Sequence, residues 1–191
     1  MQLSDKNPTP IYEQPENEVV HVNNDQIDMP GTEVVKGNIP RTITGWWRTS
    51  QKDSYNVYEC GNPGTGCGNS FAFGRWFGEH ATSRQGLTCH TWCGCYSDTV
   101  GKSGRDVGPS DNTWHHFAHI WDGESHFLYY DGELYSSGGD ANRELSTAAT
   151  GCVFGSRDDR FNFKGDVKGL KIYTEALDAT QIKILSGKFN A

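Results

Sequence analysis

Alternating hydrophobic and polar residues, interrupted by short turn sequences, are clearest in residues 113–134. Asp122-Gly123 and Asp131-Gly132 are turn pairs, because glycine takes positive φ there, and each pair is bounded by residues that favour a pleated strand. Two strand-and-turn units therefore follow one another directly. This segment predicts a β-meander.

Similar patterns predict further strands on both sides of the meander, followed by one helix. The strands are expected at residues 18–22, 32–36, 42–49, 57–59, 70–76, 87–92, 152–155 and 165–173. The helix is expected at residues 178–185, with Asp178 as N-cap, Gln181 completing a capping box and Gly187 after its end. Residues 1–17 contain three prolines and predict an extended N-terminal arm or linker, so that the folded domain spans residues 18–191.

Three segments resemble laminin-G-like domains of the concanavalin A type. They are the W-H-x-hydrophobic-A sequence at residues 114–118 with its D-G turns, the early strand ITGWWR at residues 43–48, and the closing strand and short helix at residues 163–182. The resemblance covers about residues 38–187 and implies an all-β fold. The expected architecture is a two-sheet antiparallel β-sandwich, or jelly roll, with one short C-terminal helix.

The same resemblance assigns faces to the two neighbouring tryptophans of the early strand. Trp46 is implied to be the core tryptophan, while Trp47 would lie on the concave surface or in the core against the second sheet. The family usually has acidic residues at the positions held here by Lys168 and Gly169. An acidic role at these two positions therefore does not carry over.

Composition narrows the class of partner. The chain has 191 residues, enough for one domain with its own core, and no apolar run long enough to cross a bilayer, so no membrane insertion is expected. Its formal net charge is -7 and it has no stripe of basic residues. Nucleic acid is therefore not an expected partner, because such binding depends on clustered Lys and Arg.

An even number of cysteines concentrated in loops predicts disulfides, and hence an extracellular, cell-surface or virion location. The six are Cys60, Cys67, Cys89, Cys93, Cys95 and Cys152. Spacing does not choose among the possible pairings. A local Cys60–Cys67 bond is the first expectation, with Cys89, Cys93 and Cys95 holding the loop insert together. The alternative is a metal site formed by these last three cysteines with His90.

Candidate enzyme chemistry is sparse. Glycosidases of this fold place two carboxylates of an E-x-D-x-x-E strand on one face, and that motif is absent from the sequence. A polysaccharide lyase would need a proton acceptor such as His or Tyr, and the meander supplies His115, His116, His119, Tyr129 and Tyr130. The simpler interpretation is that these side chains are half-buried residues of a sandwich that form hydrogen bonds to the backbone or to water.

A loop-rich insert at residues 79–112 is the predicted ligand-binding region, because its aromatic and polar side chains suit sugar recognition. The candidate ligand-binding residues are Trp76, His80, Arg84, His90, Trp92 and Tyr96. Calcium is a common cofactor of the family, and oxygen ligands in two loops could hold it. These candidate metal ligands are Asp140, Asn142, Asp158 and Asp159.

Taken together, these features predict a non-catalytic recognition module, lectin-like, for a carbohydrate or a glycoprotein surface. Two alternatives belong to other classes. One is a polysaccharide lyase or another glycan-active enzyme that uses the meander. The other is a structural or assembly subunit of a virion, an appendage or a large complex, in which the N-terminal arm docks on a neighbour.

Overall fold

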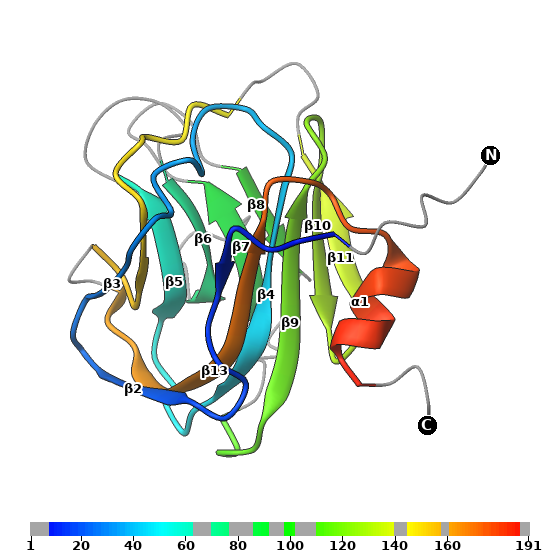
Figure 1. Cartoon of the computed structure of the whole chain (residues 1–191). Coiled ribbons are helices and arrows are strands. Elements are labelled where there is room, and N and C mark those ends of the chain that lie inside the picture. Colours follow the sequence, from blue (N-terminus) through cyan, green and yellow to red (C-terminus); the bar gives the residue numbers. More distant parts are fainter. Residues whose placement is uncertain are drawn as a thin grey trace.

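Two antiparallel sheets packed face to face make up the domain (Figure 1). The structure is a computed structural model that describes residues 8–62, 70–76, 86–91, 98–101, 110–139, 145–157 and 161–187. Within these residues the fold is all-β with one short helix. The predicted fold class is therefore confirmed.

The first sheet has seven strands in the order β1-β13-β4-β9-β10-β11, and β2 also pairs with β13. Its strands are β1 (Tyr12–Glu13), β2 (Val19–Asn23), β4 (Arg41–Arg48), β9 (His115–Trp121), β10 (His126–Tyr130), β11 (Glu133–Gly138) and β13 (Lys164–Tyr173). The second sheet has six strands in the order β3-β12-β5-β6-β7-β8. These are β3 (Ile27–Met29), β5 (Tyr55–Gly61), β6 (Ser70–Trp76), β7 (Gly86–Thr91), β8 (Asp98–Gly101) and β12 (Cys152–Phe154).

The meander and the helix have the local structure that their sequences predict. Asp131 (φ 49°) and Gly132 (φ 81°) both have positive φ, as a tight turn between β10 and β11 requires. The helix α1 spans Ala179–Leu185, and Asp178 and Gln181 form the reciprocal capping box at its start. Gly187 (φ 69°) follows its end in the left-handed region.

Other segments differ from the sequence predictions. Residues 32–36 do not form the predicted strand, because the backbone turns there and the Val35 amide donates to the Thr32 carbonyl (3.0 Å). Strands β3 and β8 were not anticipated, since both are short. Within the segment expected to be an arm, Tyr12 pairs with Ile172 of β13, so that β1 is an integral strand.

Aromatic side chains fill the space between the sheets. Trp47 of β4 is fully buried and meets Phe73 of β6 edge-on at 5.2 Å between ring centroids. Phe117 of β9 stacks on the same Phe73 at 4.4 Å, and Tyr58 of β5 stacks on Phe117 at 5.8 Å. Burial of such large rings contributes strongly to the hydrophobic stabilisation of the fold.

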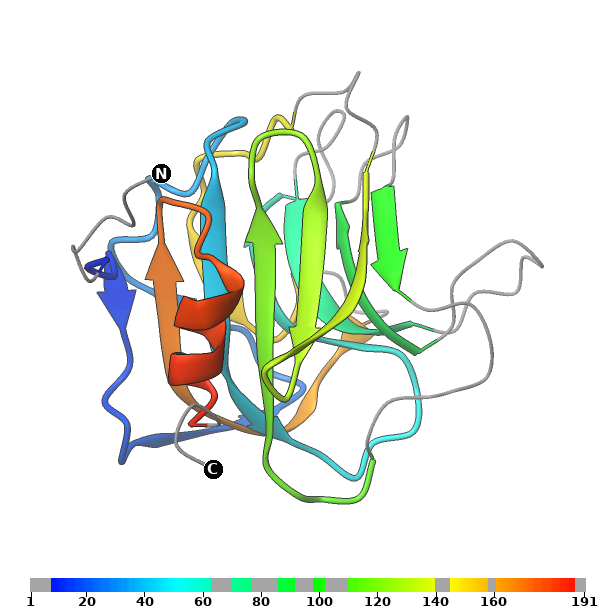
Figure 2. The ribbon, with the colours of Figure 1, turned by 90° about the vertical axis from the view of Figure 1, so that its right-hand side faces the viewer.

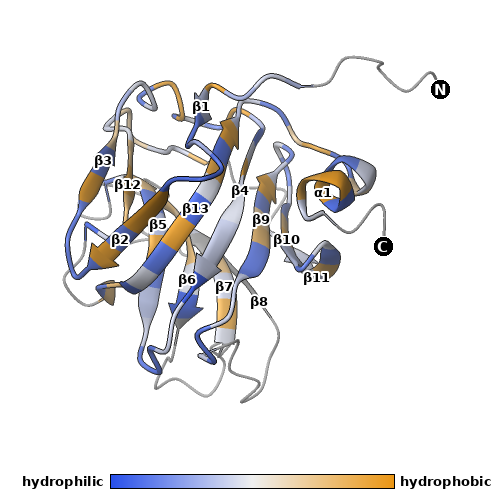
Figure 3. Ribbon diagram, turned by 60° about the horizontal axis from the view of Figure 1, so that its bottom comes forward, coloured by the Kyte–Doolittle hydropathy of each residue, from blue (hydrophilic) through white to orange (hydrophobic). Residues whose placement is uncertain are grey.

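The helix covers part of the outer face of the seven-stranded sheet (Figure 2). Ile182 of α1 is fully buried against a second apolar cluster that includes Ala118, Ile120 and Tyr173. Hydrophobic and hydrophilic residues alternate along β13, as expected for a strand with two different faces (Figure 3). No helix in the described part of the chain is long and apolar enough to span a membrane.

Candidate functional site

A pocket of about 540 Å³ lies on the outer face of the seven-stranded sheet, next to the end of α1. Strands β4, β9 and β13 form its floor. The side chains that matter most are Thr44, Trp46, Trp114, His116, Lys168 and Lys171. A pocket lined by aromatic rings with a few polar groups is a typical ligand site.

Strand alternation places Trp46 in this pocket and its neighbour Trp47 in the core. Trp46 is half-buried, whereas Trp47 has an exposed fraction of 0%. The assignment of Trp46 to the core, implied by the family resemblance, is therefore wrong. Successive side chains of a strand point to opposite faces of the sheet, so one of two adjacent tryptophans faces the core and the other faces outward. The sequence of two adjacent tryptophans does not show which of them faces the core.

A β-bulge in β13 shapes the floor of the pocket. The register between β13 and β4 shifts between Lys168 and Lys171, and Gly169 within the bulge has a φ of 56°. Glycine adopts this left-handed conformation without the strain that a Cβ atom would bring. The bulge leaves Lys168 directly opposite Trp46, so the lysine and the half-buried aromatic residue lie on the same face of adjacent strands.

Trp114 brings two cations to the same edge of the pocket. The Lys168 Nζ lies 4.5 Å from the centre of its ring, and the Arg48 Cζ lies 4.8 Å from it. Arg48 also donates to the Asp166 carboxylate (2.6 Å). Lys168 forms no ion pair with any residue that the structure describes, and its described contact is the Trp114 ring.

A second lysine in the pocket is already neutralised. The Lys171 Nζ lies 2.9 Å from Glu13 Oε1 and 3.4 Å from Glu16 Oε1. Partial burial lowers the pKa of Lys171, but the hydrogen bonds and charges of Glu13 and Glu16 outweigh this effect and raise it above its ordinary value. Lys171 thus ties the N-terminal segment to β13.

His116 supports the Trp46 ring from the neighbouring strand. It lies opposite Trp46 in the β4–β9 register, and the two rings meet edge-on at 5.2 Å. The Thr44 hydroxyl donates to the Phe117 carbonyl (2.8 Å) and lies 2.9 Å from His116 Nε2. The His116 Nε2–H therefore donates to Thr44, which fixes the orientation of the imidazole.

The candidate ligand residues of the insert lie elsewhere. Trp76 ends β6 and His90 lies in β7, so their backbones belong to the six-stranded sheet and not to the sheet that carries the pocket. His80, Arg84, Trp92 and Tyr96 are outside the described residues, as are the candidate calcium ligands Asp140, Asn142, Asp158 and Asp159. Both sites stay predictions. The described pocket was missed because its residues come from three separate segments.

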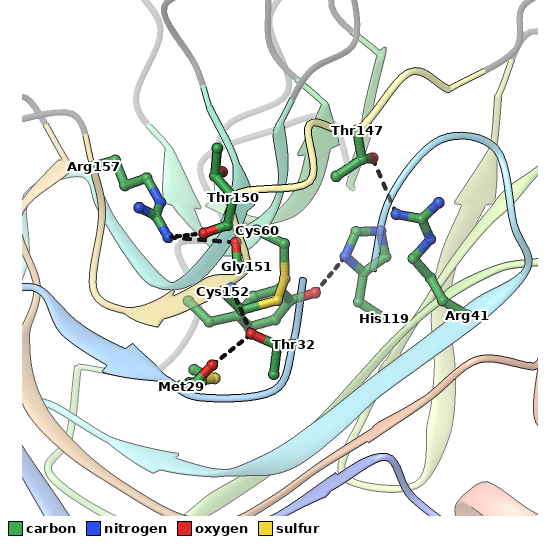
Figure 4. Close-up of a disulfide and its surroundings, with 11 residues drawn as sticks. Met29, Thr32, Arg41, Cys60, His119, Thr147, Thr150, Gly151, Cys152 and Arg157 are labelled. Atoms are coloured by element: carbon green, nitrogen blue, oxygen red, sulfur yellow. Dashed lines mark hydrogen bonds between the residues drawn. A yellow bond between two sulfur atoms is a disulfide. The ribbon is translucent and has the colours of Figure 1, made fainter. Parts of the chain in front are cut away.

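The disulfide joins two strands rather than the ends of one loop. Cys60 of β5 is bonded to Cys152 of β12, 92 residues away, which corrects the expected Cys60–Cys67 pairing. The two residues lie directly opposite each other in adjacent antiparallel strands, and Thr32 braces this site by accepting from the Cys152 amide (2.8 Å; Figure 4).

The remaining cysteines give a mixed outcome. Cys89 is a buried thiol and not one of the half-cystines predicted to staple the insert. It lies in β7, so it is part of a regular strand and not of a loop that needs a covalent tie. Cys67, Cys93 and Cys95 lie outside the described residues.

Two of the meander side chains considered as a catalytic base, His119 and Tyr130, have surroundings that work against that role. His119 has an exposed fraction of 0% and its Nδ1 lies 2.7 Å from the Tyr58 hydroxyl in the core. Tyr130 contacts His115 (2.7 Å), but burial, with smaller effects from Asp131 and Asp111, raises the pKa of Tyr130 well above its ordinary value. A raised pKa works against Tyr130 as a proton-accepting phenolate.

Solved structures with this fold belong to several proteins. Domain 4 of AbnA, a GH43 extracellular arabinanase from Geobacillus stearothermophilus, in complex with arabinotriose, has a TM-score of 0.67 at 18% identity, with 96% of this chain and 84% of that chain covered. The CBM40 of the Ruminococcus gnavus IT-sialidase has a TM-score of 0.60 at 15% identity, covering 95% and 97%.

A third similar structure is the binding domain of Botulinum neurotoxin DC in complex with SialylT, with a TM-score of 0.61 at 13% identity. It covers 93% of this chain, which spans about half (51%) of that domain. At these identities the likeness establishes the fold. No curated protein sequence matches the chain.

A family model assigns the chain to a family, which single structures at low sequence identity cannot do. The model described as concanavalin A-like lectin/glucanases superfamily matches residues 22–183. This range includes β4, β9 and β13, the three strands that build the pocket. The chain therefore belongs to the concanavalin A-like lectin/glucanase superfamily.

Proposed function

We propose that this domain is a carbohydrate-binding module whose outer pocket holds an acidic sugar. The observation that carries the proposal is the pairing of Trp46 with Lys168 across β4 and β13. The half-buried Trp46 ring offers an apolar surface for the C–H groups of a sugar ring. Lys168, held over Trp114, offers a positive charge to a sugar carboxylate.

The sign of the charge favours an acidic sugar over a neutral one. The whole chain carries a formal net charge of -7, so a cation inside the pocket differs in sign from the protein as a whole. Lys171 is balanced by Glu13, whereas the nearest described partner of Lys168 is the Trp114 ring. A charge-assisted hydrogen bond to a partly buried carboxylate contributes about 1.5–3 kcal/mol.

The similar structures support the class of ligand. One was solved with arabinotriose, one with SialylT, and one is the CBM40 of a sialidase. Two of these three names refer to sialic acid chemistry, in which the sugar carries a carboxylate. The Cys60–Cys152 disulfide is typical of proteins in oxidising compartments, which fits a domain that meets glycans outside the cell.

The two alternative functions have less support from the described residues. A lyase would need an accessible base, yet His119 is buried in the core and the Tyr130 pKa is raised. A docking arm for assembly would leave the N-terminal segment unpaired in the isolated chain, whereas Tyr12 pairs with Ile172 within the same chain. We accordingly propose a binding role without catalysis.

A glycan panel measured by titration calorimetry tests the proposal. It should compare sialylated and uronate-containing oligosaccharides with neutral counterparts of the same linkage, each with and without chelator. We expect the acidic members to bind and Lys168→Gln to weaken them at least tenfold. Lys164→Gln, which changes an exposed lysine of the same strand, is the matched control and should bind normally.

Three results would count against this function. The first is equal affinity for neutral and acidic glycans, which would remove the role of Lys168. The second is unchanged binding by Lys168→Gln, which would move the site away from the pocket. The third is release of reducing ends or of unsaturated, ultraviolet-absorbing products during the titration, which would establish an enzyme.

A further inference from the structure

A cysteine and two histidines converge in the interior, between the two sheets. Cys89 comes from β7, His119 from β9 and His126 from β10, and all three side chains have an exposed fraction of 0%. The Cys89 Sγ and one nitrogen of each imidazole lie within 4.8 Å of one another. Strands from both sheets therefore present three metal-ligating atoms to one point of the core.

The two imidazoles already lie at nearly the separation that a shared ion requires. His119 Nε2 and His126 Nδ1 are 3.0 Å apart. Zinc–nitrogen bonds of about 2.0–2.1 Å at tetrahedral angles place two nitrogen ligands about 3.3 Å apart. An opening of a few tenths of an ångström would admit an ion between the rings, and a rotation of the Cys89 side chain would bring its sulfur to the remaining side.

The surroundings orient the ligands as outer groups do in metal sites. The Tyr58 hydroxyl lies 2.7 Å from His119 Nδ1, which leaves Nε2 directed at the cluster. Phe71 stacks on the His119 ring at 3.8 Å between centroids, and Trp121 packs against His126 at 4.6 Å. A partner on the second imidazole nitrogen fixes the tautomer and raises the basicity of the ligand, and the aromatic rings exclude water.

We propose that Cys89, His119 and His126 bind one thiophilic transition-metal ion inside the sandwich. The donor set consists of a thiolate and two neutral imidazoles, which suits Zn²⁺ or Cu⁺ and not Ca²⁺ or Mg²⁺, since these prefer oxygen ligands. Arg41 lies near the cluster, with its Cζ 5.1 Å from the Phe71 ring centre. Cu⁺ bound to the Cys89 thiolate has no net charge, so it adds no positive charge next to the Arg41 guanidinium. Cu⁺ is therefore tested together with Zn²⁺.

This site differs from the metal site considered from sequence, in which Cys89 joined Cys93, Cys95 and His90. It uses residues 89, 119 and 126, brought together by the pairing of the strands, and it binds its ion in the core. The outer pocket lies on the opposite face of β9, where His116 points away from His119. Metal binding and glycan binding can therefore fail independently.

The experiment uses the full 191-residue chain, unfolded with chelator and refolded with Zn²⁺, Co²⁺ or Cu⁺, the last without oxygen. After removal of loose metal, elemental analysis should find one ion of Zn²⁺ or Cu⁺ per chain. The Co²⁺ form should show a sulfur-to-cobalt charge-transfer band, which reports a bound thiolate directly. The metal should also raise the melting temperature, because it binds the folded state.

Variants locate the ion. Cys89→Ser should lose the charge-transfer band and the bound ion, and His126→Gln should weaken metal binding at least tenfold. His116→Gln changes a buried histidine on the other face of the same strand and should keep one ion per chain. Circular dichroism of each variant checks that the fold is intact, and the cobalt band of the unchanged chain is informative even if Cys89→Ser does not fold.

Two outcomes overturn the proposal. If neither Zn²⁺, Co²⁺ nor Cu⁺ stays bound to the refolded chain, the three residues form only a buried hydrogen-bonded group. If Cys89→Ser folds and keeps its ion and its charge-transfer band, the metal is held by other cysteines.

Discussion

Trp46 and Trp47 are adjacent in β4 and have opposite surroundings. Trp47 points between the sheets and meets Phe73 and Phe117, whereas Trp46 points outward and lines the pocket beside His116 and Lys168. The two side chains are chemically the same. The face of the sheet on which each ring lies decides whether it stabilises the fold or is free to contact a ligand.

The largest expected effect is on the inner face. Trp47→Ala should lower the free energy of unfolding by about 3–5 kcal/mol, because it leaves a cavity among closely packed rings. Chemical denaturation measures the change. Trp46→Ala, the matched control on the same strand, should cost clearly less. Equal losses in the two variants would erase the distinction between the two faces.

The disulfide tests the same distinction in the six-stranded sheet. Replacing Cys60 and Cys152 together by Ala removes a cross-link between residues 92 positions apart and should destabilise the fold by about 2–4 kcal/mol. Glycan affinity should hardly change where the variant stays folded, because the pocket lies on the other sheet. A loss of glycan affinity at a temperature well below the melting point of the variant would contradict this expectation. It would show that the disulfide in the six-stranded sheet affects the pocket on the other sheet.

On the outer face the expected effect is on binding. Trp46→Ala should weaken an acidic glycan by about 1–3 kcal/mol, which is the range for removing a central aromatic contact. Calorimetry gives the affinity and thermal melting gives the stability of the same sample. If the affinity is unchanged while the protein melts much earlier, Trp46 would be a packing residue and the pocket would not be the site.

The smallest effect concerns acid stability at the edge of the outer face. Partial burial raises the pKa of Asp166, but the hydrogen bonds and charges of Arg48 and His21 outweigh it and hold the pKa below its ordinary value. The ionised form is therefore favoured by folding. This stability is present above the unfolded pKa of about 3.9 and is lost as the pH falls through the lower folded value.

Asp166→Asn removes this contribution, so the difference in unfolding free energy between the original chain and the variant should shrink between pH 6 and about pH 3. Asp28→Asn, an exposed change in β3, serves as control. A difference that stays constant over this range would show that Asp166 acts through packing and not through its charge.

Local sequence patterns predicted the elements of the fold better than they predicted which residues meet. Turn pairs such as Asp131-Gly132 and the capping box at Asp178 depend on neighbouring residues, and both formed as expected. Which residues of β4 face the core depends on which face of the strand meets the second sheet. Two adjacent tryptophans are compatible with either arrangement. The Cys60–Cys152 pairing likewise depends on strands far apart in the sequence.

The pocket was not predictable for the same reason. Trp46, Trp114 and Lys168 come from three segments, and the bulge at Gly169 that places Lys168 opposite Trp46 has no local signal strong enough to reveal it. The sequence did show that Lys168 departs from the acidic residue usual in the family. That departure indicated only that an acidic role does not carry over to this position.

The most direct test of the central claim is to follow the indole N–H signals of all six tryptophans by NMR while an acidic glycan is added. We expect the signals of Trp46 and Trp114 to shift in a saturable way and the signal of Trp47 to stay in place. If Trp76 or Trp92 shifts instead, while Trp46 and Trp114 do not, the glycan binds at the insert and the outer pocket is not the functional site.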